Sequence, residues 1–95
     1  MAGADNYEVL QLTDEEYAEV GIKPTEIRLI VLAEGDYCVH VPALGEYGFG
    51  DTISAALKDL AGGIKWFYAF LTTREPDLTD GLADDLKRFR ALVAE

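Results

Sequence analysis

The chain has 95 residues, 49% of them apolar, so we expect one globular domain over residues 1–95 with a single modest core. Eighteen acidic and eight basic side chains give a formal charge of −10, which repels nucleic-acid phosphate and attracts basic protein surfaces. Direct nucleic-acid binding by this chain alone is therefore not expected. The acidity is concentrated in residues 1–50, which hold ten acids and two bases.

The cysteine content and the hydropathy pattern bear on localisation. Cys38 is the single cysteine, which excludes an intrachain disulfide and fits a reducing compartment. No segment joins basic residues to an apolar h-region, and no apolar run approaches the ~20 residues that span a bilayer. We therefore expect a cytoplasmic protein without a membrane partner.

The first quarter of the chain predicts a frayed end, a short strand and a short helix. Residues 1–6 are small and polar, and we expect a flexible terminus. The segment "YEVLQL" is a candidate for a short additional strand. Thr13 and Glu16 then have the spacing of a capping box, in which each side chain accepts from a backbone amide of the other residue. Gly21 and Pro24 should end this helix after about two turns.

Residues 27–44 are typical of a β-hairpin. Two runs rich in Ile, Val and Leu flank Glu34-Gly35-Asp36, a cluster that favours a turn. Alternation places Ile27, Leu29, Val31 and Ala33 on one face of the first strand, with Ile30 and Leu32 on the other. Because both faces are partly apolar, we expect another element or subunit to cover the second face, which favours a homo-oligomer.

The stretch "GEYGFGDT", residues 45–52, raises the question of a phosphate-binding loop. Its glycines have the spacing GxxGxG rather than the dinucleotide spacing GxGxxG, and Glu46 and Asp51 add negative charge where a phosphate would lie. Glycine more simply supplies turn geometry and close backbone approach. We therefore predict a short third strand with Tyr47 and Phe49 on one face.

Residues 52–72 are predicted to form the longest helix. Asp51 or Thr52 can cap it and Pro76 stops it. Its apolar residues recur at three- and four-residue intervals: Ile53, Ala56, Leu57, Leu60, Ile64, Phe67, Tyr68 and Leu71. Gly62 and Gly63 should each cost roughly 1 kcal/mol relative to Ala, which indicates a packing reason or a kink. Trp66 and Phe70 project from the opposite side, one turn apart.

A last helix is expected within residues 79–95, at about 80–94 after Thr79. Leu82, Leu86, Phe89 and Val93 follow 4-3-4 spacing and form an apolar seam. We expect this seam to dock on Trp66 and Phe70, with the glycines allowing close approach. A neighbouring subunit could supply the seam instead, so these six residues are candidates for either helix packing or an oligomer interface.

No catalytic or metal constellation emerges. Cys38 and His40 share one face of a strand, but no second Cys or His completes a metal site, and parallel neighbours do not make a nucleophile–base pair. Paired carboxylates such as Asp14/Glu15 and Asp84/Asp85 belong to helix starts or solvated faces. We therefore expect no enzyme, no metal and no cofactor.

The predicted elements make an α+β fold: an antiparallel three-stranded sheet, with a possible fourth N-terminal strand, packed on one long helix with a short helix before and another after. Within residues 27–72 this order resembles the HicB-like antitoxin domain family. In that family a hairpin with Y-x-V-x-V-P-x-L leads to G-D-T and a helix with E-A-L-like residues. The matching positions here are Tyr37, Val39, Val41, Pro42, Leu44, Gly50, Asp51, Thr52, Ala56 and Leu57.

The resemblance implies a protein that binds and neutralises a small basic ribonuclease toxin by occlusion. Acidic groups would mimic RNA phosphates while aromatic side chains fill the centre of the contact. The expected partner surface lies around the hairpin tip and third strand: Glu34, Asp36, Glu46, Tyr47 and Phe49. The alternative is a stand-alone, non-enzymatic oligomeric domain, which explains the same sequence features without a toxin.

Overall fold

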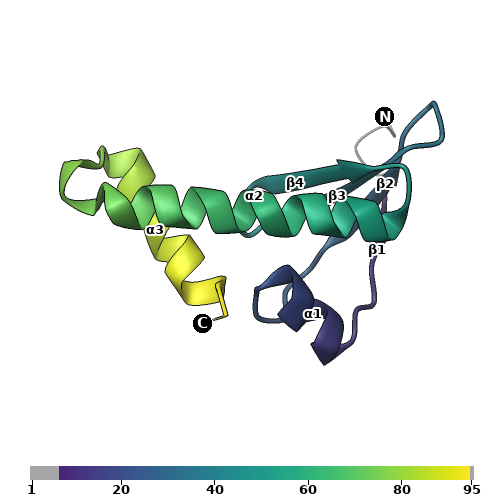
Figure 1. The fold of residues 1–95 in the computed structure, drawn as a ribbon, viewed down its shortest axis with the longest axis horizontal. Helices are drawn as coiled ribbons and strands as arrows, with labels where there is room; N and C mark the ends of the chain where they lie inside the picture. The colour runs from purple at the N-terminus through teal and green to yellow at the C-terminus, as the bar shows by residue number, and fades with distance from the viewer. Residues whose placement is uncertain (1–6, 95) are drawn as a thin grey trace.

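A computed structural model describes residues 7–94 of the chain as four strands, three α-helices and one 3₁₀ turn (Figure 1). The predicted flexible terminus, residues 1–6, lies outside the described residues. In chain order the elements are β1 (Glu8–Val9), α1 (Asp14–Val20), β2 (Arg28–Val31), β3 (Tyr37–Val41), β4 (Glu46–Gly50), α2 (Ile53–Thr73), η2 (Glu75–Asp77) and α3 (Asp80–Leu92). The α+β fold class is confirmed, and the fourth N-terminal strand is present.

The sheet is antiparallel throughout, with the order β1-β2-β3-β4. Its central rung joins Leu29 to Val39 and Val39 to Gly48, and all three residues are buried. Strand β2 ends at Val31, which is 63% exposed, so the predicted buried face does not continue to Ala33. The chain leaves the sheet there because the tight turn at Gly35, with φ of +88°, closes the hairpin.

The helix boundaries follow local capping chemistry. Thr13 and Glu16 form both bonds of the predicted capping box, and Gly21 ends α1 with φ of +93°. Thr52, rather than Asp51, is the N-cap of α2, because its hydroxyl accepts from the Ala55 backbone amide at 3.0 Å. Thr79 caps α3 in the same way, accepting from the Leu82 amide at 3.4 Å.

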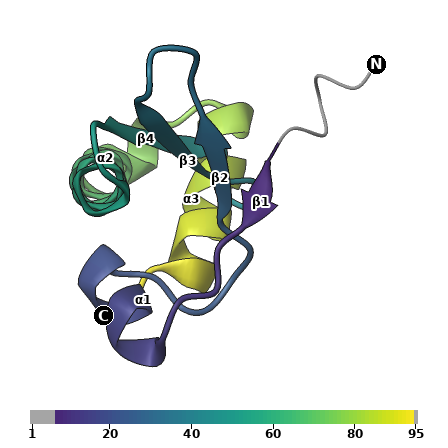
Figure 2. The ribbon, with the colours of Figure 1, turned by 90° about the vertical axis from the view of Figure 1, so that its right-hand side faces the viewer.

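Helix α2 packs on the inner face of the sheet, above β3 and β4 (Figures 1 and 2). The two strand glycines of "GEYGFGDT" make this contact possible. A Cβ on Gly48 would lie 2.6 Å from the backbone nitrogen of Leu60, and one on Gly50 would lie 2.7 Å from the Ala55 Cβ. Gly45 serves the turn before β4, with φ of +67°. The stretch is therefore a turn and a helix-docking strand, and the space a phosphate would need is filled by helix backbone.

The core lies between the sheet and the helices. Its fully buried side chains come from the segment after α1, from β3 and from helices α2 and α3, and include Ile22, Ile27, Val39, Val41, Leu60, Ile64, Leu71 and Phe89. The segment after α1 also meets the end of α3. Ile22 forms a β-bridge with Val93, and the Lys23 amide donates to the Leu92 carbonyl at 2.7 Å. The segment after α1 thus holds the end of α3 in place.

The contact between α2 and α3 differs from the prediction. Phe89 is fully buried and packs edge-on against Phe67, with centroids 5.4 Å apart, and stacks on Tyr68 at 6.5 Å. Trp66 is 67% exposed, so the expectation that the seam covers Trp66 is wrong. The reason is helical phase: α3 approaches the side of α2 that already carries the core stripe, which leaves Trp66 turned away.

The predicted role of Gly62 and Gly63 is also wrong. A Cβ on Gly62 would meet no atom within 4 Å, and one on Gly63 would make only an ordinary contact of 3.7 Å with Glu46 Oε1. Neither glycine is therefore needed for the approach of α3. Helix α2 continues unbroken through both residues. Among the described residues, no helix is both long and apolar enough to cross a bilayer.

Candidate protein-binding surface

Within the described residues 7–94, no helix covers the side of the sheet away from α2 (Figure 2). Side chains alternate along a strand, so the neighbours of the buried Leu29, Val39 and Gly48 point to this side. We call it the outer face, and it comprises Val9, Arg28, Ile30, Cys38, His40, Tyr47 and Phe49. None of these seven strand positions holds a carboxylate, although the chain has a formal charge of −10.

Three aromatic rings form a row on the outer face. His40 on β3 and Tyr47 on β4 are paired across the strands, and their rings stack with centroids 4.2 Å apart and an interplanar angle of 5°. Tyr47 is followed by Phe49, 6.4 Å away and nearly parallel. Tyr47 and Phe49 are 50% and 54% exposed. Half of each ring is therefore available for contact, and the row is held in place by cross-strand packing.

Arg28 is the one formal charge among the outer-face positions at neutral pH. Its guanidinium lies over the Tyr7 ring, 4.4 Å from the centroid, and pairs with Glu26. Burial, with Arg28 as a second cause, lowers the pKa of His40, so this imidazole is neutral at pH 7. Burial raises the pKa of the Cys38 thiol, which keeps it protonated. The outer face is thus largely uncharged and aromatic.

Acidic groups border one end of this face. The last rung of the β3–β4 pair is Tyr37 with Gly50, and the next residues along each strand are Asp36 and Asp51. Both are exposed, as is Glu34 in the hairpin loop. Phe49 therefore lies two residues from Asp51 at this carboxylate-rich edge. A patch with an aromatic centre and a charged edge has the usual composition of a protein–protein interface.

The structure does not bring the five predicted partner-binding residues onto one surface. Tyr47 and Phe49 are on the outer face, and Glu34 and Asp36 border it. Glu46 instead points to the inner side, where its Oε1 lies near Gly63 of α2. Burial, with Asp85 as a second cause, raises the pKa of Glu46. Its grouping with Tyr47 is wrong because adjacent residues of a strand face opposite sides of the sheet.

Cys38 and His40 do share the outer face as predicted. Cys38 is only 4% exposed, beneath its neighbours, and its cross-strand partners are Ile30 and Phe49. Among residues 7–94, no group of three or more His, Cys, Asp or Glu side chains is arranged to hold a metal ion. The pair therefore belongs to the packing of the aromatic row.

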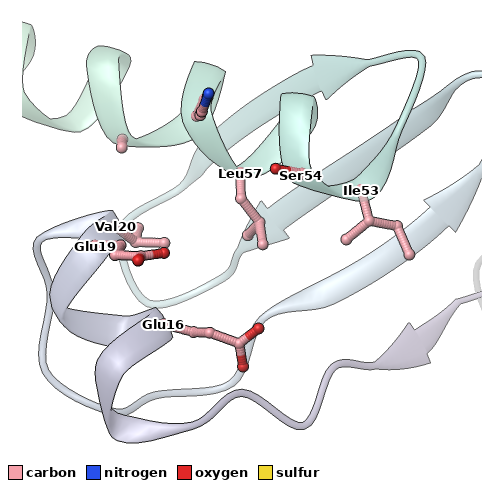
Figure 3. A pocket seen from close by; sticks show the side chains of 8 residues that line it. Glu16, Glu19, Val20, Ile53, Ser54 and Leu57 are labelled. Carbon is pink, nitrogen blue, oxygen red and sulfur yellow. The ribbon is translucent and has the colours of Figure 1, made fainter.

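A separate groove runs between α1 and α2. Figure 3 shows Glu16, Glu19 and Val20 extending from α1, while Ile53 and Leu57 extend from α2 toward them. Glu16 belongs to the capping box of α1, since its Oε1 accepts a hydrogen bond from the Thr13 amide at 2.8 Å. Most of the remaining lining is apolar. The groove has the character of an incompletely closed helix–helix contact.

Sequence reasoning missed the contribution of Arg28, His40 and Tyr7 to the candidate surface. The alternation of β2 and β3 would have placed Arg28, Cys38 and His40 on the face shared with Tyr47, once the register was known. Register depends on turn geometry and on which face is buried. Because both faces of β2 are partly apolar, the sequence does not decide which of them is buried.

Comparison of the chain with protein-family models, with curated proteins and with solved structures finds no match. A function therefore has to be inferred from the chain's own residues.

Proposed function

We propose that this protein is a HicB-like antitoxin-type protein that binds a small basic ribonuclease toxin and blocks it by occlusion. The observation that carries the proposal is the outer face: a half-exposed aromatic row without carboxylates, bordered by acidic residues at the hairpin end. The motif from Tyr37 to Leu57 supports the same assignment by resemblance. Both features lie in the same hairpin-and-helix segment.

The chemistry of the outer face suits a basic protein. Tyr47 and Phe49 offer their ring faces to the cationic side chains of Arg and Lys, a contact worth about 0.5–1 kcal/mol at an exposed site. Asp36, Asp51 and Glu34 attract the same cations from the border and accelerate the encounter. A toxin held in this way presents its RNA-binding cations to the antitoxin, so RNA cannot reach them.

The test starts with purification of this chain from its own cells at low salt, and with any small basic protein that copurifies with it. That protein is separated, its cleavage of RNA is measured, and this chain is added back. We expect stoichiometric inhibition that weakens as salt rises, because exposed charges are screened. The variant Tyr47→Ser/Phe49→Ser should inhibit at least tenfold less well.

A matched control uses the opposite side of the sheet. Glu46→Gln should inhibit as well as the wild-type chain, because Glu46 does not reach the outer face. A basic partner without ribonuclease activity would refute the toxin assignment and leave a protein-binding role. Inhibition by the Tyr47→Ser/Phe49→Ser variant equal to that by the wild-type chain would refute the assignment of the outer face as the toxin-binding surface.

The alternative function is that of a stand-alone oligomeric domain. The specific observation in its favour is Trp66, which is 67% exposed on α2 and stacks on Phe70 at 5.6 Å. A large exposed ring is costly to leave in water and is common at interfaces. This alternative predicts a defined homo-oligomer and no basic partner in the same purification.

A further inference from the structure

Helix α2 presents one continuous face to solvent. It consists of exposed residues at helical spacing: Lys58, Asp59, Gly62, Lys65, Trp66 and Ala69. Ala55 has the same helical phase but is half-buried, because its Cβ packs against Gly50 of β4. In Figure 2, which looks nearly along α2, the helix lies at the edge of the molecule with the sheet on one side only. We call these six residues the α2 face.

The two edges of the α2 face have different chemistry. At 100° per residue, Lys58 and Lys65 lie on one side of the line through Gly62 and Ala69, and Asp59 and Trp66 lie on the other. One edge is therefore cationic. The other carries a carboxylate and the most exposed aromatic ring of the described residues. No ion pair of Lys58 or Lys65 occurs among residues 7–94.

We propose that a second copy of this chain binds the α2 face, with the two α2 helices side by side and parallel. A two-fold axis parallel to the helices carries each edge of one copy onto the opposite edge of the other. Lys58 then faces Asp59 of the second copy, and Lys65 faces its Trp66. The two-fold symmetry repeats each of these two contacts, so each occurs twice in the dimer. An antiparallel pair would instead set Lys58 against Lys65, so charge selects the parallel arrangement.

The centre line fits the same arrangement. Gly62 and Ala69 are seven residues apart, so each meets its own counterpart along a parallel seam. A Cβ at Gly62 would meet nothing within 4 Å in one chain, and glycine there costs roughly 1 kcal/mol of helix stability relative to Ala. The close approach of a second helix gives this glycine a packing role, because interaxial distance depends on the side chains at the contact.

Asp59 can form the ion pair with Lys58 of the second copy even though it already makes a hydrogen bond within its own chain. Its Oδ2 accepts from the Phe49 backbone amide at 2.9 Å, which fixes the carboxylate at the free edge of β4. The other oxygen and the negative charge are open to Lys58 of the second copy. Because the Phe49 bond holds this side chain in place, less conformational entropy is lost when the ion pair forms.

Sedimentation equilibrium over a range of protein concentrations tests the proposal. We expect a monomer–dimer equilibrium that Gly62→Leu and Trp66→Ala each weaken at least tenfold. Gly81→Leu on α3 is the matched control, since Gly81 also has open space around it, and it should leave the dimer unchanged. Urea unfolding at low concentration checks that each variant folds. A monomeric wild-type chain, or a dimer insensitive to Gly62→Leu, would overturn the proposal.

The orientation has its own test. Ala69→Cys should form a disulfide-linked dimer on mild oxidation, because Ala69 meets Ala69 in a parallel pair; Cys38 is buried and does not interfere. Efficient cross-linking only when Lys58→Cys and Lys65→Cys chains are mixed would show an antiparallel pair and refute the arrangement.

Charge reversal provides an independent check. Lys58→Asp should weaken the dimer at least tenfold and Lys58→Asp/Asp59→Lys should restore much of it. Tyr47→Ser/Phe49→Ser should leave the dimer unchanged, which separates this result from that of the proposed partner surface. Loss of the dimer in that outer-face variant would mean that the sheet, and not α2, forms the interface.

Discussion

Gly48 on β4 lies directly beneath the Leu60 backbone of α2, so close that a Cβ added to Gly48 would be 2.6 Å from the Leu60 nitrogen. Both residues are buried. This approach sets the distance between the two layers of the fold and leaves Tyr47 and Phe49 on the opposite side. The placement of the aromatic row therefore depends on a glycine that is itself buried beneath α2.

Gly48→Ala should destabilise the protein by about 1–3 kcal/mol, because the helix backbone must shift to admit the methyl group. Urea unfolding followed by circular dichroism measures the change. Gly81→Ala is the control, since nothing lies within 4 Å of its added Cβ and alanine favours the helix. Equal stability of Gly48→Ala and the wild-type chain would show that the layers are not in such close contact.

Phe89→Ala should cost about 3–5 kcal/mol, the usual range for removing a fully buried aromatic side chain. The loss includes its contacts with Phe67 and Tyr68, which attach α3 to α2. Trp66→Ala should change the monomer by less than about 1 kcal/mol, since surface substitutions seldom cost more. Chemical denaturation of both variants at low concentration distinguishes them. A larger loss for Trp66→Ala would restore the predicted docking of α3 on Trp66.

Glu46→Gln should stabilise the protein more at pH 7 than at pH 4. Burial, then Asp85, raises the pKa of Glu46 in the folded state, so the folded chain holds this proton more tightly than the unfolded chain. Stability from this group is therefore present at low pH and is lost as pH rises through the folded-state pKa. Thermal unfolding from pH 4 to 7 measures the difference. Gly81→Ala, which changes no titratable group, is the control.

His40 should titrate below its ordinary pKa, as measured by NMR of the imidazole protons. Burial is the main cause and Arg28 the second, so Arg28→Gln should raise the midpoint only in part. Because the folded state favours neutral His40, this group's contribution to stability is lost as pH falls below the unfolded-state pKa. Lys87→Gln on α3 is the control. A midpoint above the ordinary value would contradict the burial of His40 against Tyr47.

Local features were predictable because their causes are local. The capping box of Thr13 and Glu16, the end of α1 at Gly21 and the turn at Gly35 each depend on residues within about four positions, and all three occur as expected. The long helix was predictable from a repeated apolar spacing that outweighs two glycines. Periodicity over some twenty residues tolerates a few unfavourable propensities.

The order of the strands and α-helices, and an apolar stripe on each of the two longer helices, follow from the sequence alone, whereas the 3₁₀ turn Glu75–Asp77 was not predicted. The tertiary structure alone decided which side of each strand meets α2, and so placed Glu46 apart from Tyr47, joined His40 to the aromatic row and turned Trp66 toward solvent. The physical reason is that strand register and helix phase are set by close packing between distant segments. A shift of one residue moves a side chain to the opposite face, and no local pattern records which choice packs best.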